Sequence, residues 1–232
     1  MGNQKYQLLE HTIECKVKYI ISYTYELPIK STSLFDKIIN DAFSISISGK
    51  AEEDEIRYRN FQLSLDSRNI LVDVLVFEPN KVSIKFFDKS KVGETILNKI
   101  LDEYKKAYSI SPDKKLVKSC EYSTYIKAKS NLKVSDLIKK EAKSLLEKSG
   151  EESKKLYGEE FQVKIHPYLI RSVIQLFPPG SNLDDSRLIS KSYIFAIQHE
   201  SFEEYIEGIT SFYSELPYET HVKLIENFLK SL

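Results

Sequence analysis

The amino-acid sequence predicts an α+β fold in which amphipathic helices pack on one face of a mainly antiparallel sheet. Three observations lead to this prediction. Long segments alternate between apolar and polar residues, tight-turn residues separate several of these segments, and stretches with helical periodicity lie between them. Strands that follow one another through short turns pair antiparallel, and their helices can then pack together on one face of the sheet.

The first half of the chain predicts a strand, a helix, a three-stranded meander and a second helix. Residues 13–27 alternate strictly between apolar and polar side chains, which indicates a long strand with one buried face. Apolar residues then recur at helical spacing over 34–43. Three strand segments joined by hairpin-type turns follow at 56–65, 70–77 and 81–87. A second amphipathic helix is predicted over 92–108.

The second half of the chain begins the same rhythm again. An alternating segment at 116–128 predicts a strand, and a helix is predicted over 132–148. Two further strands are predicted at 161–177 and 188–199, with a turn rich in Pro and Gly between them. No residue-level repeat accompanies this similarity.

A C-terminal helical pair is predicted to close the chain. Ser201 and Glu204 have the spacing of a capping box, and apolar residues continue at helical spacing to Tyr213. Pro217 interrupts the chain, and a last amphipathic helix follows it. If the apolar faces of this pair were left exposed, they would provide a contact for homo-oligomerisation.

Two similar α+β layers are therefore expected, one in residues 1–110 and one in residues 111–232. The first would hold a strand, a helix, a three-stranded meander and a helix. The second would hold a strand, a helix, two strands and two helices. The alternative is one continuous domain, because 232 residues also fall within the size range of a single large domain.

The composition excludes several classes of protein. Hydrophobic residues make up 41% and charged residues 29% of the chain, which is typical of globular domains and argues against disorder. Cys15 and Cys120 are far apart in the sequence and have no partner at CxxC spacing. A disulfide scaffold is therefore not expected, and the protein is expected in a reducing, cytoplasmic location. The longest apolar run is too short to span a bilayer, so no membrane association is expected.

The net charge of zero conceals a basic middle segment. Residues 1–80, 81–148 and 149–232 carry net charges of −3, +8 and −5. A basic surface of this kind could contact an acidic protein or a ribonucleoprotein. Sequence-specific DNA recognition is not expected, because the chain has only five arginines. The lysines expected to form the contact surface are Lys127, Lys129, Lys133, Lys139, Lys140 and Lys143.

Recognised catalytic motifs are absent from the sequence. The chain has neither GxxxxGK[ST] nor GxGxxG, and it lacks the GxSxG pattern of a nucleophile elbow. Its four histidines are isolated and lack the spacing of metal ligands. No catalytic residue, metal site or cofactor is therefore expected. The leading hypothesis is a non-catalytic, cytoplasmic binding or regulatory protein that contacts a macromolecular partner through its central Lys-rich surface.

Asp73 is the basis of an alternative hypothesis. It interrupts the apolar run 70–77, where a buried carboxylate without partners would cost several kcal/mol. One interpretation is an enzyme or small-ligand-binding protein with a site between the sheets, for example a metal-dependent nuclease. The other is that Asp73 faces solvent opposite a Lys or Arg on a neighbouring strand. Under the first interpretation, the site would combine Asp73, Tyr23, His166 and His199.

Overall fold

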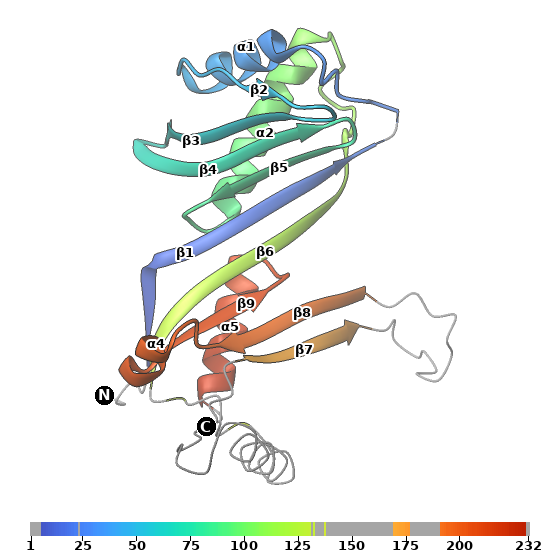
Figure 1. Cartoon of the computed structure of the whole chain (residues 1–232). Coiled ribbons are helices and arrows are strands. Elements are labelled where there is room, and N and C mark those ends of the chain that lie inside the picture. Colours follow the sequence, from blue (N-terminus) through green and yellow to red (C-terminus); the bar gives the residue numbers. More distant parts are fainter. Residues whose placement is uncertain are drawn as a thin grey trace, which may run out of the picture. The chain divides into compact units, whose positions relative to one another are not determined.

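The computed structural model describes residues 6–22, 24–130, 132, 137, 169–176 and 191–230 of the chain. These residues form an α+β fold of antiparallel strands with helices packed on them, which confirms the predicted class (Figure 1). None of the helices in these ranges is long and apolar enough to cross a membrane.

The chain divides into two compact units. The larger unit comprises Glu10–Tyr125 and Ser214–Leu232, and the smaller unit comprises Met1–Leu9 and Ile126–Tyr213. The chain therefore returns to the larger unit for its last helix. The division into layers at 1–110 and 111–232 stays a prediction.

The larger unit is a sheet with helices on one of its faces. Its strands are hydrogen-bonded in the order β2-β3-β4-β5-β1-β6, and β6 continues into the smaller unit. The strands are β1 (Tyr6–Ile21), β2 (Lys50–Ala51), β3 (Ile56–Leu65), β4 (Arg68–Glu78), β5 (Lys81–Phe86) and β6 (Val117–Ser130). The helices are α1 (Thr32–Phe43), α2 (Ser90–Ala107) and α5 (Tyr218–Lys230).

The meander and both helices of the first half are confirmed, and one strand differs from its prediction. β1 spans Tyr6–Ile21, so it begins seven residues before the predicted start at residue 13 and ends at Ile21 rather than continuing to Leu27. The amide of Tyr25 donates to the carbonyl of Ser22 at 2.8 Å, which forms a turn just after the strand. The alternation of apolar and polar residues in the sequence therefore extends past the last residue of β1.

The core of the larger unit lies between the sheet and its helices. Phe35 of α1 contacts Phe77 of β4, with ring centroids 4.3 Å apart. Gly93 of α2 lies against the ring of Phe86 on β5, because a Cβ there would stand 2.6 Å from Phe86 Cζ. Phe77 lies opposite Val82, which is four residues before Phe86 on β5, and all three are buried, so Phe77 and Phe86 point to the same face of the sheet. Helices α1 and α2 therefore cover one face of β4 and β5 (Figure 1).

A β-bulge in β4 explains the near-continuous apolar run around Asp73. The register of β4 with β5 shifts between Val72 and Val74. Val72 and Leu75 are both buried although they are three residues apart, so the strand accommodates one extra residue. The bulge keeps Val72 and Leu75 on the core face, while Asp73 and Val74 between them lie on the outward side.

The smaller unit contains the rest of β6 and three further strands. Its strands are hydrogen-bonded in the order β6-β9-β8-β7. These added strands are β7 (Leu169–Leu176), β8 (Lys191–Gln198) and β9 (Ile209–Ser214), and the short helix α4 (Phe202–Glu207) precedes β9. Phe195 of β8 contacts Phe212 of β9, with ring centroids 6.4 Å apart, and Phe212 is fully buried.

The predicted helix from Ser201 to Tyr213 is wrong in its second half. The capping prediction is confirmed at its start, where Ser201 Oγ accepts a hydrogen bond from the amide of Glu204 at 3.1 Å. The helix ends at Glu207 because Gly208 adopts a left-handed conformation, with φ at 69°. Residues Ile209–Ser214 then form β9, so the C-terminal helical pair is two helices separated by a strand.

The rest of the second half is described only in part. The predicted strands at 161–177 and 188–199 correspond to β7 and β8 over the residues that are described. The last predicted helix is confirmed as α5. The predicted helix at 132–148 lies outside the described residues except for positions 132 and 137.

Candidate functional site

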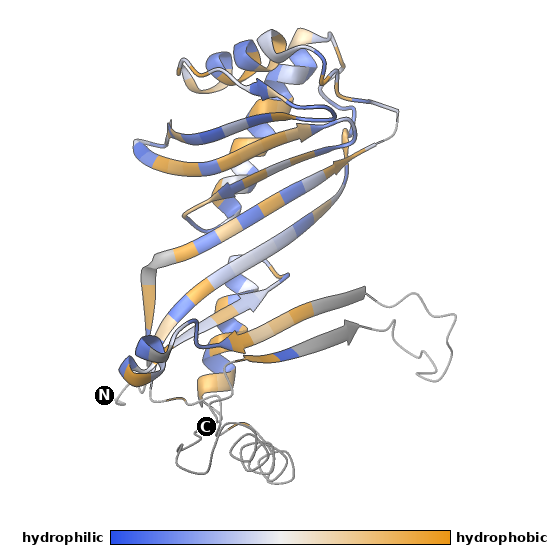
Figure 2. Ribbon diagram, viewed as in Figure 1, coloured by the Kyte–Doolittle hydropathy of each residue, from blue (hydrophilic) through white to orange (hydrophobic). Residues whose placement is uncertain are grey.

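The outward face of the larger unit's sheet is its polar face. Along each strand, the side chains that point to α1 and α2 alternate with side chains that point away from these helices. Figure 2 shows this alternation most clearly on β1. On β1, buried Cys15 and Val17 flank the exposed Lys16. Outward side chains of neighbouring strands can therefore form rows across the sheet, which the strand register identifies.

One such row carries three cationic side chains, which we call the cation row: Arg59, Lys85 and Lys16. Arg59 of β3 lies opposite Val74 of β4, Val74 lies opposite Lys85 of β5, and Lys85 lies opposite Lys16 of β1. Arg59 and Lys16 are both exposed. Neither forms an ion pair with any of the described residues.

Lys85, the middle member of the cation row, is held by two carboxylates. Its Nζ lies 3.1 Å from Glu14 Oε2 and 3.1 Å from Asp73 Oδ2. Burial alone would lower the pKa of Lys85, but the hydrogen bonds with Asp73 and Glu14 outweigh it and raise the pKa above its ordinary value. Lys85 therefore stays charged, and its ammonium group is shared between Asp73 and Glu14.

This geometry answers the question that Asp73 posed in the sequence. Its side chain lies on the outward face, about one third exposed, and pairs with a lysine of the neighbouring strand. That arrangement is the second of the two interpretations, and it confirms the expected Lys partner. Among the residues that the structure describes, no group of three or more His, Cys, Asp or Glu side chains could hold a metal ion.

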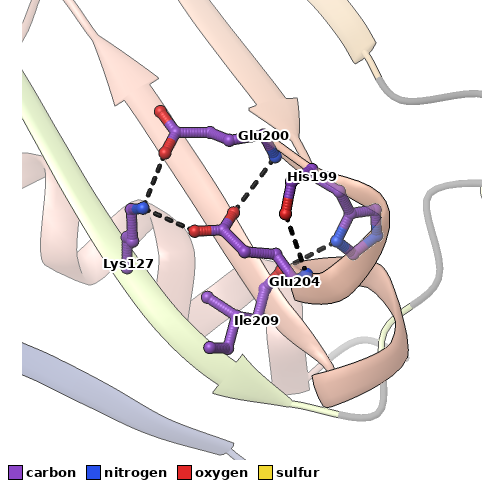
Figure 3. A network of polar contacts seen from close by, with 6 residues as sticks. Lys127, His199, Glu200, Glu204 and Ile209 are labelled. Atoms are coloured by element: carbon purple, nitrogen blue, oxygen red, sulfur yellow. Dashed lines mark hydrogen bonds and ion pairs between the residues drawn. The ribbon is translucent and has the colours of Figure 1, made fainter.

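Lys127 forms a separate network in the smaller unit (Figure 3). Its Nζ lies 2.6 Å from both Glu200 Oε2 and Glu204 Oε1. The other oxygen of Glu204 accepts a hydrogen bond from the amide of Glu200 at 3.1 Å. The Lys127 side chain is only 20% exposed. Because two carboxylates already surround it, Lys127 fixes α4 against β6 and offers little charge to a partner.

His199 belongs to the same region of the smaller unit. It is buried, and its Nδ1 lies 2.7 Å from the carbonyl oxygen of Ile209, to which it can donate as the Nδ1–H tautomer (Figure 3). The ring of Tyr205 meets the imidazole edge to face, with centroids 5.3 Å apart. These contacts hold the turn between β8 and β9 in place.

The remaining predicted site residues are placed as follows. Lys129 is exposed on β6. Asp73 belongs to the larger unit and His199 to the smaller one. The other residues of the two predicted sites lie outside the described part of the chain: Lys133, Lys139, Lys140, Lys143, Tyr23 and His166.

A polar cluster between α2 and the sheet was not predicted. The hydroxyl of Tyr122 on β6 donates to Glu94 Oε1 at 3.0 Å, and the hydroxyl of Tyr19 on β1 donates to the Glu94 carbonyl oxygen at 3.5 Å. Burial raises the pKa of both tyrosines. Both hydroxyls therefore remain protonated donors, and the cluster anchors α2 over β1 and β6.

Both cysteines are thiols rather than thiolates at neutral pH. Cys15 is fully buried, and burial raises its pKa to about 12. Burial also raises the pKa of Cys120. Neither sulfur is in a disulfide. The environment of each cysteine therefore disfavours nucleophilic chemistry.

Sequence reasoning missed Lys16, Arg59 and Lys85 as a group. Alternation assigns each residue to the polar face of its own strand, but it does not show which residues of different strands lie opposite one another.

Comparison with protein-family models, curated proteins and solved structures finds no match for this chain.

Proposed function

We propose that the protein is a non-catalytic binding protein that contacts an acidic protein partner through the outward face of the larger unit's sheet. The observation that carries this proposal is the cation row, in which Arg59 and Lys16 are exposed and make no ion pair with the described residues. Cations without an ion pair are available to a partner's carboxylates. A cation that already has a carboxylate partner contributes less binding free energy to a new contact.

The chemistry of the face favours a protein over a nucleic acid. On the outward face of β3, β4 and β5 one aromatic ring is exposed, that of Phe87, which directly follows β5, so successive bases would find little on which to stack. Carboxylates also interrupt the face, because Glu14 and Asp73 flank Lys85. A polyphosphate backbone carries a charge on every nucleotide and cannot avoid these carboxylates, whereas a polypeptide can place its own carboxylates near Lys16 and Arg59 and uncharged side chains elsewhere. A ribonucleoprotein therefore ranks below an acidic protein as the partner.

The central Lys-rich surface, which the sequence predicts as the contact, has only a minor part in this proposal. Lys129 is exposed on the part of β6 that belongs to the smaller unit, and its role in binding stays a separate prediction. Lys133, Lys139, Lys140 and Lys143 stay predictions, as does the cytoplasmic location. Homo-oligomerisation through the C-terminal helices also stays a prediction, although Ile225 and Leu229 of α5 are already buried.

The two halves of the chain are further proposed to share one arrangement of elements. In the first half, β3, β4 and β5 form a series whose last strand lies beside β1, and helix α2 follows. In the second half, β7, β8 and β9 form a series whose last strand lies beside β6, and helix α5 follows. The matching order supports two similar layers.

Charge reversal on the cation row tests the proposed contact. The double variant Lys16→Glu/Arg59→Glu would be compared with Lys37→Glu/Lys91→Glu, which changes two exposed lysines on α1 and α2. The probes are poly-L-glutamate and a homopolymeric RNA, each titrated between about 50 and 200 mM salt. We expect wild type to bind poly-L-glutamate more tightly at low salt, and the cation-row variant to bind about tenfold more weakly.

The control variant should retain the wild-type affinity for poly-L-glutamate. If the two double variants lose affinity equally, the contact is set by net charge and the cation row has no special role. If wild type prefers the RNA and the cation-row variant loses that binding, the partner is a nucleic acid and the proposed class is wrong.

A further inference from the structure

An apolar stripe runs along the middle of the same outward face. We define it by Leu71, Val74 and Val76 of β4 and by Phe87, which directly follows β5. The amide of Phe87 donates to the carbonyl of Leu71 at 3.3 Å, so these two residues are neighbours. Leu71 is 45% exposed and Phe87 is 46% exposed. Large apolar side chains that are grouped and exposed favour a contact with another molecule.

Cations border the apolar stripe on both sides. On the β3 side, Arg59 lies opposite Val74, whereas Arg57, opposite Val76, is already paired with Glu55 and Glu52. On the other side, Lys85 of β5 lies opposite Val74, and Lys16 of β1 follows it. Neighbouring strands are about 4.8 Å apart, so Arg59 on one side and Lys16 on the other, which make no ion pair with the described residues, can reach toward the stripe.

The spacing of the stripe matches that of an extended peptide. Val74 and Val76 are two residues apart on one strand, which corresponds to about 6.8 Å. Alternate side chains of an extended segment have the same separation. A segment that lay along β4 could place two apolar side chains on the stripe, and its carboxylates would then lie near the cations on both sides.

From this arrangement we infer that the partner contributes an extended acidic segment whose alternate apolar side chains dock on the apolar stripe. The inference rests on the proposed function and adds the chemistry of the ligand. The cations beside the stripe favour acidic side chains in the partner's segment. The exposed Leu71 and Phe87 favour apolar side chains at the positions of that segment that contact the stripe. A nucleic acid matches the stripe less well, because its bases could stack on the ring of Phe87 but find no flat ring in the aliphatic rest of the stripe.

Two short synthetic peptides test the inference. Both are rich in glutamate; one carries two leucines at alternate positions, and the other carries serines in their place. We expect wild type to bind the leucine peptide about tenfold more tightly than the serine peptide, measured by fluorescence anisotropy. The variants Leu71→Ser and Phe87→Ser should each reduce this preference to within about twofold.

Matched variants separate the possible failures. Ile206→Ser removes a side chain that is 67% exposed in the smaller unit, and it should leave the preference for the leucine peptide intact. The double variant Lys16→Glu/Arg59→Glu should lower the affinity for both peptides to the same extent. A wild-type protein that binds both peptides equally overturns the inference and leaves the proposed function standing. Failure to bind either peptide overturns the proposed function as well.

Discussion

Lys16 of β1 lies directly opposite Lys85 of β5 in the antiparallel register, which places two ammonium groups on neighbouring outward positions. Like charges in such a pair repel and destabilise a sheet. Glu14 and Asp73, each 3.1 Å from Lys85 Nζ, offset that repulsion. The carboxylates therefore balance Lys85, while Lys16 remains available at the surface.

The first prediction concerns this balance of charges. The double variant Glu14→Gln/Asp73→Asn should lower the free energy of unfolding by about 1 kcal/mol at low salt, because Lys85 would then face Lys16 with no compensating charge. The loss should shrink as salt rises, since the groups are about one third exposed. Urea denaturation measures the effect. In a Lys16→Ala background the loss should be smaller, and an equal loss there would contradict the explanation.

The second prediction concerns the contact between α2 and the sheet. Gly93→Ala should lower the free energy of unfolding by about 1–2 kcal/mol, although alanine favours a helix over glycine by about 1 kcal/mol. The added Cβ would stand 2.6 Å from Phe86 Cζ and 2.9 Å from Val17 Cγ2, and both of these side chains are fully buried. Thermal or urea unfolding gives the value.

A double-mutant cycle tests the cause of that loss. In a Phe86→Leu background the smaller side chain leaves room for the methyl group, so Gly93→Ala should cost less there. Asp102→Ala, at an exposed position of the same helix, should change stability by less than about 0.5 kcal/mol. If Gly93→Ala stabilises the protein, the close packing described above is wrong.

Local sequence patterns predicted most of the larger unit. The segment 56–65 matches β3, and the helix predicted over 92–108 matches α2 to within two residues. These elements are long, periodic and bounded by turn residues, so their pattern depends little on distant contacts. The helix predicted through Tyr213 failed because one glycine ends it, and the residues beyond that glycine pair with a strand that lies elsewhere in the sequence.

The candidate site was harder to predict than the fold. The sequence marks Lys127 as part of a basic segment, but its carboxylate partners, Glu200 and Glu204, lie more than 70 residues away along the chain. The cation row likewise depends on the register between four strands. Side-chain alternation specifies a face of each strand, whereas the pairing across strands is set by the whole sheet.

The third prediction separates a structural lysine from a surface lysine. Lys127→Met should destabilise α4, because Glu200 and Glu204 would lose the cation that lies 2.6 Å from each of them. The expected cost is about 1–2 kcal/mol, seen as faster hydrogen exchange of the α4 amides. Lys129→Met, at an exposed position on the same strand, should leave that exchange unchanged. Equal exchange rates in the two variants would show that Lys127 does not support α4.

The fourth prediction concerns the pH dependence of stability. His221 on α5 is fully buried, and burial lowers its pKa to about 3. Above about pH 6.5 the imidazole is neutral in both the folded and the unfolded chain, so it adds no pH dependence. As the pH falls below this value, only the unfolded chain takes up the proton, and the free energy of unfolding decreases until the folded pKa is reached. The part due to His221 should be about 2 kcal/mol at pH 5.

Urea denaturation of wild type and His221→Phe between pH 5 and pH 7.5 measures it as a difference in slope, which is independent of any constant loss from the substitution. Parallel curves for the two proteins would show that another group causes the pH dependence.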